Sequence, residues 1–147
     1  MTIRPEFSEV RELAGNGRYK VVPVSCELLS DFITPIEAMR ILKNVSSHCY
    51  MLESAQQGEK WGRYTFLGYD PKMEITCVNG RLTANHLSIE TAHPSDVLRQ
   101  ILADWNSPRV EGLPSFTGGL VGYFSYDYLF YSEPTARRET EDSEGFK

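Results

Sequence analysis

Two short clusters of polar residues in the first half of the sequence could bind a charged small molecule. The apolar run 50–52 ends in Glu53 and Ser54, and a polar loop that contains glycine follows. A second apolar run then begins with Arg63, Tyr64 and Thr65. Carboxylates accept hydrogen bonds, hydroxyls donate and accept them, and guanidinium groups donate them. The sequence therefore predicts a hairpin whose polar ends meet at one place and could bind a zwitterion.

The same residues also have an ordinary structural interpretation. Glu and Ser are common at exposed strand ends, and a hairpin register could place Arg63 beside Glu53. An exposed cross-strand ion pair of this kind is worth less than about 1 kcal/mol. In the alternative, Glu53 binds the ammonium of a ligand, and the hydroxyls of Ser54 and Thr65 bind its carboxylate. The residue types alone leave both interpretations open.

The elements that must position these residues are mostly strands. Runs rich in β-branched and aromatic residues predict strands at 19–24, 47–53, 63–69, 73–78, 81–87 and 118–127. Asn79-Gly80 gives the strongest hairpin signal, because a type I′ turn requires positive φ at both central residues. The last strand, 118–127, is apolar on both faces and is predicted to be buried.

Three helices are predicted, at 7–14, 34–43 and 93–105. In the second helix Thr34 can act as the N-cap, Pro35 occupies the first helical position and Glu37 completes a capping box. Apolar residues at helical spacing are expected on one face of the second helix (Ile36, Met39, Leu42) and of the third (Val97, Leu98, Ile101, Leu102, Trp105). The stripe on the third helix should lie on a sheet. Since strands outnumber helices and the clearest turn is a hairpin, we predict an α+β domain, mainly an antiparallel sheet with packed helices.

Composition excludes several classes of function. The chain has 147 residues, 41% hydrophobic and 24% charged, with a formal net charge of −5. A negative charge argues against binding of nucleic acid or of an anionic membrane surface, and no apolar run reaches the roughly 20 residues that span a bilayer. The three cysteines lack a C-x-x-C spacing. We therefore expect a cytoplasmic protein, folded over 1–133 and followed by a charged tail at 134–147.

No catalytic or metal-binding constellation is recognisable. The glycines at 118, 119 and 122 lack the Lys-Ser/Thr of a phosphate-binding loop, so a bulge or a close backbone approach is the preferred interpretation. His48, His86 and His93 are scattered and have no carboxylate nearby in the sequence. Cys26 has no neighbouring base that would activate its thiol.

Several segments, in the same order and at similar spacing, resemble chorismate-utilising enzymes and most closely component I of anthranilate synthase. They are the helix start at 32–38, the Leu-Glu-Ser and Arg-Tyr-Thr-Phe clusters at 50–54 and 63–66, the Gly-x-Asp-Pro turn at 68–71, and the Gly-Gly-Leu-Val-Gly-Tyr-Phe-Ser-Tyr-Asp segment at 118–127. Together they extend over about two-thirds of the chain. Thr65 replaces the usual serine of this family but keeps the hydroxyl.

The resemblance implies that this is the N-terminal part of a larger two-layer fold. The parent enzyme would convert chorismate, with ammonia from a glutamine amidotransferase subunit (component II), to anthranilate and pyruvate. Its Mg²⁺ ligands and acid/base groups would lie in the C-terminal portion, which is absent here. The residues implied to bind the feedback inhibitor L-tryptophan are Leu52, Glu53, Ser54, Arg63, Tyr64 and Thr65. Two alternatives are aminodeoxychorismate synthase component I and a stand-alone amino-acid-binding module.

Overall fold

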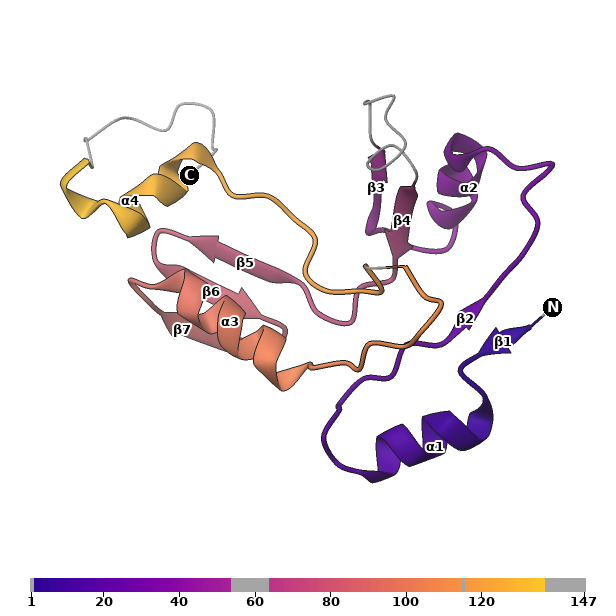
Figure 1. Cartoon of the computed structure of the whole chain (residues 1–147). Helices are drawn as coiled ribbons and strands as arrows, with labels where there is room; N and C mark the ends of the chain where they lie inside the picture. The colour runs from indigo at the N-terminus through magenta and orange to yellow at the C-terminus, as the bar shows by residue number, and fades with distance from the viewer. Residues whose placement is uncertain (1, 54–63, 115, 137–147) are drawn as a thin grey trace. The chain divides into compact units, whose positions relative to one another are not determined.

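A computed structural model describes residues 2–53, 64–114 and 116–136 (Figure 1). The chain divides into two compact units, one formed by Met1–Glu27 with Ile75–Lys147 and the other by Leu28–Glu74. Every strand pair among the described residues is antiparallel, and helices accompany the sheets. The predicted α+β class is therefore confirmed.

The largest sheet belongs to the first unit and has the order β5-β6-β7. Strand β5 (Ile75–Val78) is joined to β6 (Arg81–Ala84) by Asn79 and Gly80, whose φ angles are 50° and 83°. Positive φ at both positions is what the Asn-Gly signal predicted. The expected strand 81–87 begins at the right residue but is too long, because Asn85 takes φ 51° and the chain turns there into β7 (Leu87–Glu90). Asn enters the left-handed region more readily than most residues, so a turn forms without glycine.

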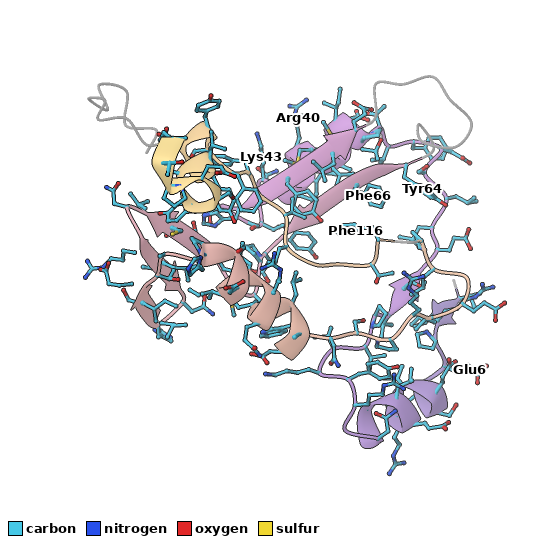
Figure 2. The ribbon with its side chains drawn as sticks, turned by 60° about the vertical axis from the view of Figure 1, so that its left-hand side comes forward. Glu6, Arg40, Lys43, Tyr64, Phe66 and Phe116 are labelled. Carbon is cyan, nitrogen blue, oxygen red and sulfur yellow. The ribbon has the colours of Figure 1, made fainter. Side chains whose placement is uncertain are left out.

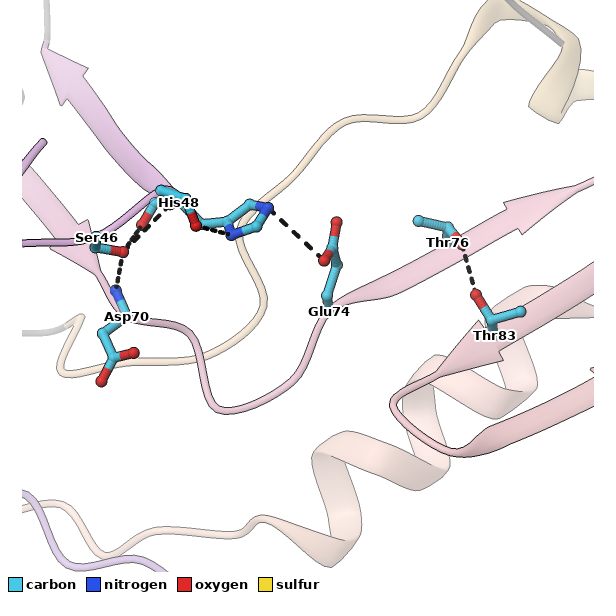
Figure 3. A network of polar contacts seen from close by, with 7 residues as sticks. Ser46, His48, Asp70, Glu74, Thr76 and Thr83 are labelled. Carbon is cyan, nitrogen blue, oxygen red and sulfur yellow. Dashed lines mark hydrogen bonds and ion pairs between the residues drawn. The ribbon is translucent and has the colours of Figure 1, made fainter.

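The two faces of this sheet differ in character. Leu82 and Ala84 are two residues apart in β6 and therefore lie on the same face. They are the two buried hydrophobic residues among those described, with exposed fractions of 0% and 6%. On the other face the hydroxyls of Thr76 and Thr83 are hydrogen-bonded across the strands at 2.6 Å (Figure 3). One apolar face and one polar face are typical of an antiparallel sheet that is covered on one side.

Helix α3 (Pro94–Asp104) lies beside this sheet in both views (Figures 1 and 2). Its boundaries match the predicted helix closely, with His93 as the N-cap residue and Trp105 as the C-cap residue. The apolar stripe is only partly covered: Leu102 and Trp105 are 49% and 41% exposed, whereas Val97, Leu98 and Ile101 are half-buried.

The beginning of the chain contains α1 (Phe7–Gly15), which was predicted, and two short paired strands, β1 (Ile3–Arg4) and β2 (Ser25–Cys26). The predicted strand 19–24 is wrong. Its residues Lys20 and Val21 instead donate backbone hydrogen bonds to the carbonyl of Asn106. A β-rich run without a neighbouring strand has no ladder to join, and the proline at position 23 removes one of its donors.

The predicted buried strand 118–127 is also wrong. Residues 118–125 form no strand, and the chain then enters a 3₁₀ turn (η1, Tyr126–Tyr128) and the short helix α4 (Leu129–Ser132). Gly118 and Gly119 have φ of 147° and 146°, values that side-chain-bearing residues rarely adopt. A further 3₁₀ turn, η2 (Pro134–Ala136), begins the expected charged tail, and the rest of that tail lies outside the described residues.

The second unit contains α2 (Pro35–Leu42) and the hairpin of β3 (Cys49–Glu53) and β4 (Thr65–Tyr69), and α2 contacts both strands. The predicted capping box is confirmed. The backbone N–H of Glu37 donates to the Thr34 hydroxyl at 3.3 Å, and the backbone N–H of Thr34 donates to the Glu37 carboxylate at 3.1 Å. The expected apolar face is only partly right, because Ile36 is 64% exposed. Ala38, Met39 and Leu42 are half-buried instead.

Candidate ligand-binding site

The β3–β4 hairpin brings part of the predicted binding cluster together. In its register Glu53 lies directly opposite Thr65, and Leu52 lies opposite Phe66. The Glu53 side chain is exposed and Thr65 is half-buried. The hairpin predicted from the two apolar runs is thus confirmed, with a carboxylate and a hydroxyl side by side at the end of its paired region. Ser54 and Arg63 lie outside the described residues.

The candidate residues divide between the two faces of the hairpin. Directly opposed residues share a face, and faces alternate along each strand. Glu53 and Thr65 therefore share one face, while Leu52 and Phe66 share the other. Tyr64 belongs with the apolar group, because its ring centroid is 5.8 Å from that of Phe66 (Figure 2). Leu52 and Tyr64 are 48% and 42% exposed, so apolar surface at this end of the hairpin is accessible.

A close packing of Tyr50 on Gly68 lies further along the apolar face. The two residues are directly opposite in the register. A Cβ atom added at Gly68 would overlap Cε1 and Cζ of the Tyr50 ring, so the ring lies over the glycine backbone. An aromatic side chain that covers a glycine on the opposite strand is a known means of fixing strand register. Sequence reasoning missed this pair, because it is recognisable only once the register is known.

The other end of the hairpin is held by Ser46 (Figure 3). Its hydroxyl accepts hydrogen bonds from the backbone N–H of Asp70 at 3.1 Å and of His48 at 3.2 Å, and it donates to the His48 carbonyl at 2.9 Å. Asp70 has φ 48° and directly follows the last residue of β4. The predicted Asp-Pro turn therefore ends the strand, and Ser46 connects the residue after β4 to the segment before β3.

His48 has a carboxylate near it in space, although this carboxylate is distant in the sequence. Its Nε2 lies 3.7 Å from a carboxylate oxygen of Glu74, and its Nδ1 is 3.1 Å from the Ser47 hydroxyl. The side chains of His48 and Glu74 are 58% and 63% exposed, so solvent screens their attraction and the pair contributes little to stability. Within the described part of the chain, no group of three or more His, Cys, Asp or Glu residues could hold a metal ion.

Comparison with known proteins shows which enzymes this chain is related to. The chain is 35% identical over 145 residues, 99% of its length, to the probable anthranilate synthase component 1 of Schizosaccharomyces pombe. It is 38% identical to anthranilate synthase component 1 of Pseudomonas aeruginosa over 85% of its length, and 36% identical to that of Aquifex aeolicus over 91%. This chain belongs to the anthranilate synthase component I family.

The resemblance inferred from the motifs is therefore confirmed. The chain spans about a quarter of these relatives, covering 27%, 26% and 28% of their lengths, respectively. No protein-family model matches the chain, and no solved structure matches it. Of the motifs shared with component I, the helix start and the Asp-Pro turn have the expected local structures, whereas the glycine-rich segment lacks the expected strand.

None of the helices in the described ranges has both the length and the apolar character that crossing a membrane requires.

Proposed function

We propose that this segment is the N-terminal scaffold of an anthranilate synthase component I and forms part of its L-tryptophan feedback site. The parent enzyme would make anthranilate and pyruvate from chorismate and ammonia in the cytoplasm. Ammonia would come from a glutamine amidotransferase partner, which is consistent with relatives named as component 1 of an enzyme. The Mg²⁺ ligands and the catalytic groups would belong to the part of the enzyme that this segment does not span.

The observation that carries the proposal is the placement of Glu53 opposite Thr65 at one end of the hairpin. An exposed carboxylate can accept hydrogen bonds from the ammonium group of an amino acid. A hydroxyl beside it can donate to the carboxylate of the same ligand. Ser54 and Arg63 follow and precede these positions in the sequence, and would add a second hydroxyl and a cation.

The apolar residues at this end of the hairpin suit the other part of the ligand. Leu52 and Tyr64 expose about half of their side chains, and Tyr64 packs on Phe66. An indole buries a large apolar area and favours contact with aliphatic and aromatic groups. A zwitterion next to an apolar surface is the chemistry of an aromatic amino acid, and this supports L-tryptophan as the ligand.

The two rival functions have less support. Aminodeoxychorismate synthase component I shares the Leu-Glu-Ser segment, but the relatives described above carry the name anthranilate synthase. A stand-alone amino-acid sensor would have to complete its pocket within 147 residues, and relatives about four times as long give it no support. Determining the complete reading frame of the gene would separate the enzyme from the sensor.

The experiment uses the complete enzyme that carries this segment, assayed with its partner for inhibition by tryptophan. We expect Glu53→Gln, Ser54→Ala and Thr65→Val each to remove one polar contact with the ligand. Loss of a hydrogen bond to a charged group costs about 1.5–3 kcal/mol, so half-inhibition should require roughly 10- to 100-fold more tryptophan. Uninhibited turnover should hardly change, because the feedback site is separate from the chemistry.

The matched control is Glu90→Gln. Glu90 is also an exposed carboxylate at a strand end, with its oxygen 3.5 Å from Nε of Arg81, but it belongs to the other sheet. Its substitution should leave tryptophan sensitivity unchanged. Normal sensitivity in all three hairpin variants, or damaged turnover with normal sensitivity, would show that this hairpin is not the feedback site.

A further inference from the structure

The tripeptide Asn-Gly-Arg occurs twice in this chain, at 16–18 and at 79–81. Both asparagine side chains are exposed. An asparagine followed by glycine is prone to spontaneous deamidation, because glycine has no Cβ to hinder attack by its amide nitrogen. The two sites share the same two following residues, so the fold is the main source of any difference in their reactivity.

The reaction needs a free amide nitrogen and a peptide group that can rotate. The glycine N–H gives its proton to water, and the nitrogen attacks Cγ of the asparagine side chain. The new bond closes a succinimide ring, the bond from Cγ to Nδ2 breaks, and ammonia leaves with a proton returned by water. Water then opens the ring at either carbonyl and yields aspartate or isoaspartate. A hydrogen bond that holds the glycine N–H, or a turn that fixes the peptide group, therefore slows the reaction.

The fold restrains the peptide group that follows Asn79. The backbone N–H of Gly80 donates to the hydroxyl of Tyr131 at 2.8 Å, where α4 lies near the turn between β5 and β6 (Figure 1). The carbonyl of Gly80 accepts a hydrogen bond from the backbone N–H of Thr91 at 2.8 Å. The residues on either side of the turn are paired in the β5–β6 ladder. The peptide group between Asn79 and Gly80 can therefore rotate only if this turn opens.

Asn16 is the C-cap residue of α1, and the peptide group that follows it is held much less. The backbone N–H of Asn16 donates to the Glu12 carbonyl at 3.2 Å, but the N–H of Gly17 has no hydrogen-bond partner among the described residues. Gly17 has φ 67°, and a Cβ built on it would meet no atom within 4 Å. The backbone N–H of Arg18 donates to Oδ1 of Asn16 at 2.8 Å, which draws electron density from Cγ and makes it a better electrophile. The Gly17 nitrogen is therefore free to attack.

We propose that Asn16 is the site at which the folded protein spontaneously deamidates, and that the Tyr131 hydroxyl protects Asn79 from the same reaction. Aspartate at position 16 adds a negative charge where α1 ends, and the C-terminal end of a helix dipole is already negative. Helix α1 has no basic residue in its last turn to offset that charge. Isoaspartate adds a methylene group to the backbone itself. Either product should loosen the C-terminal end of α1.

The test uses the complete enzyme, incubated at mildly alkaline pH and then digested with trypsin. Cleavage after the basic residues gives one peptide for each site, 12–18 and 73–81, and mass spectrometry with chromatographic separation measures aspartate and isoaspartate in each. We expect Asn16 to deamidate at least about 10-fold faster than Asn79 in the native enzyme, because the turn must open before Asn79 reacts. In denaturant the two rates should converge. Equal rates in the native enzyme, faster reaction at Asn79, or a difference that persists in denaturant would overturn the proposal.

A pair of tyrosine variants of the complete enzyme tests the protecting hydroxyl. Tyr131→Phe keeps the ring but removes the acceptor of the Gly80 N–H, and it should speed deamidation of Asn79 about 2- to 10-fold. Tyr128→Phe is the matched control, because the Tyr128 ring packs on that of Tyr131, with centroids 5.7 Å apart, and its hydroxyl has no hydrogen bond within the described ranges. Neither variant should change the rate at Asn16.

An unchanged rate at Asn79 in Tyr131→Phe, or equal acceleration by both variants, would overturn the role of the hydroxyl. Tryptophan plays no part in these measurements, so their failure is distinct from failure of the feedback proposal.

Discussion

The contact between Tyr50 and Gly68 makes a quantitative prediction about the hairpin that carries the candidate site. A methyl group at Gly68 would overlap the Tyr50 ring and lie 2.7 Å from its hydroxyl oxygen, so the ring must move away. Overpacking costs about 1–3 kcal/mol, whereas replacing glycine in a strand recovers about 0.5–1 kcal/mol of backbone entropy. Gly68→Ala should therefore destabilise the hairpin by about 1–2 kcal/mol.

The assay is hydrogen exchange of β3 and β4 amides in the complete enzyme, where local opening of the hairpin controls the rate. A loss of about 1–2 kcal/mol corresponds to exchange that is about 5- to 30-fold faster. In a Tyr50→Ala background the overlap is gone, so Gly68→Ala should be neutral or slow the exchange. Gly15→Ala is the control, because a Cβ there meets no atom within 4 Å and α1 is remote in sequence from the hairpin. Equal acceleration by Gly68→Ala in both backgrounds would refute the role assigned to the ring.

Three other predictions follow from the capping box and from the share of the enzyme that this chain represents. Thr34→Ala should destabilise α2 by about 1 kcal/mol, seen as faster exchange of its amides, while Thr34→Ser should retain the cap; equal exchange in the two variants would contradict the cap's role. The 147-residue chain, incubated with chorismate, ammonium and Mg²⁺, should yield no fluorescent anthranilate, and turnover at enzyme-like rates would refute the proposed scaffold role. Calorimetry of the same chain should show no tryptophan binding below about 100 μM, because only one wall of the indole pocket is expected here. Tight binding at one site per chain would support the stand-alone sensor instead.

The parts of the fold that were predicted correctly depend on chemistry local to a few residues. Asn79-Gly80 predicts its hairpin because two adjacent residues must adopt positive φ, and both do. The capping box of Thr34 and Glu37 is likewise complete within four positions. For the candidate site, the two apolar runs with polar ends were sufficient to predict the hairpin and the meeting of its polar ends, but not the register that places Glu53 opposite Thr65.

The strand predictions that were wrong share a different cause, because a strand requires a partner strand that its own residues do not specify. The runs 19–24 and 118–127 have the composition of strands, but neither joins a ladder among the described residues. The turn at Asn85 was missed because it lacks glycine. To predict the Tyr50–Gly68 contact one must know the register of the two strands, which a hydrophobic pattern limits but does not determine.

Side chains alternate between the two faces of the hairpin, and this restricts how one small ligand could contact the six candidate residues. Glu53 and Thr65 lie on one face, and Leu52 lies with Phe66 on the other. Adjacent residues of a strand point in opposite directions, so a ligand on one face cannot contact both Leu52 and Glu53 through their side chains. It can reach both only around the end of the paired region, where Glu53 and Thr65 form the final pair. A zwitterion held at that end, with its ring turned towards the apolar face, satisfies this geometry. In the sequence Ser54 directly follows Glu53 and Arg63 comes two residues before Thr65, so the second hydroxyl and the cation that the resemblance to component I implies belong to the chain just beyond this final pair.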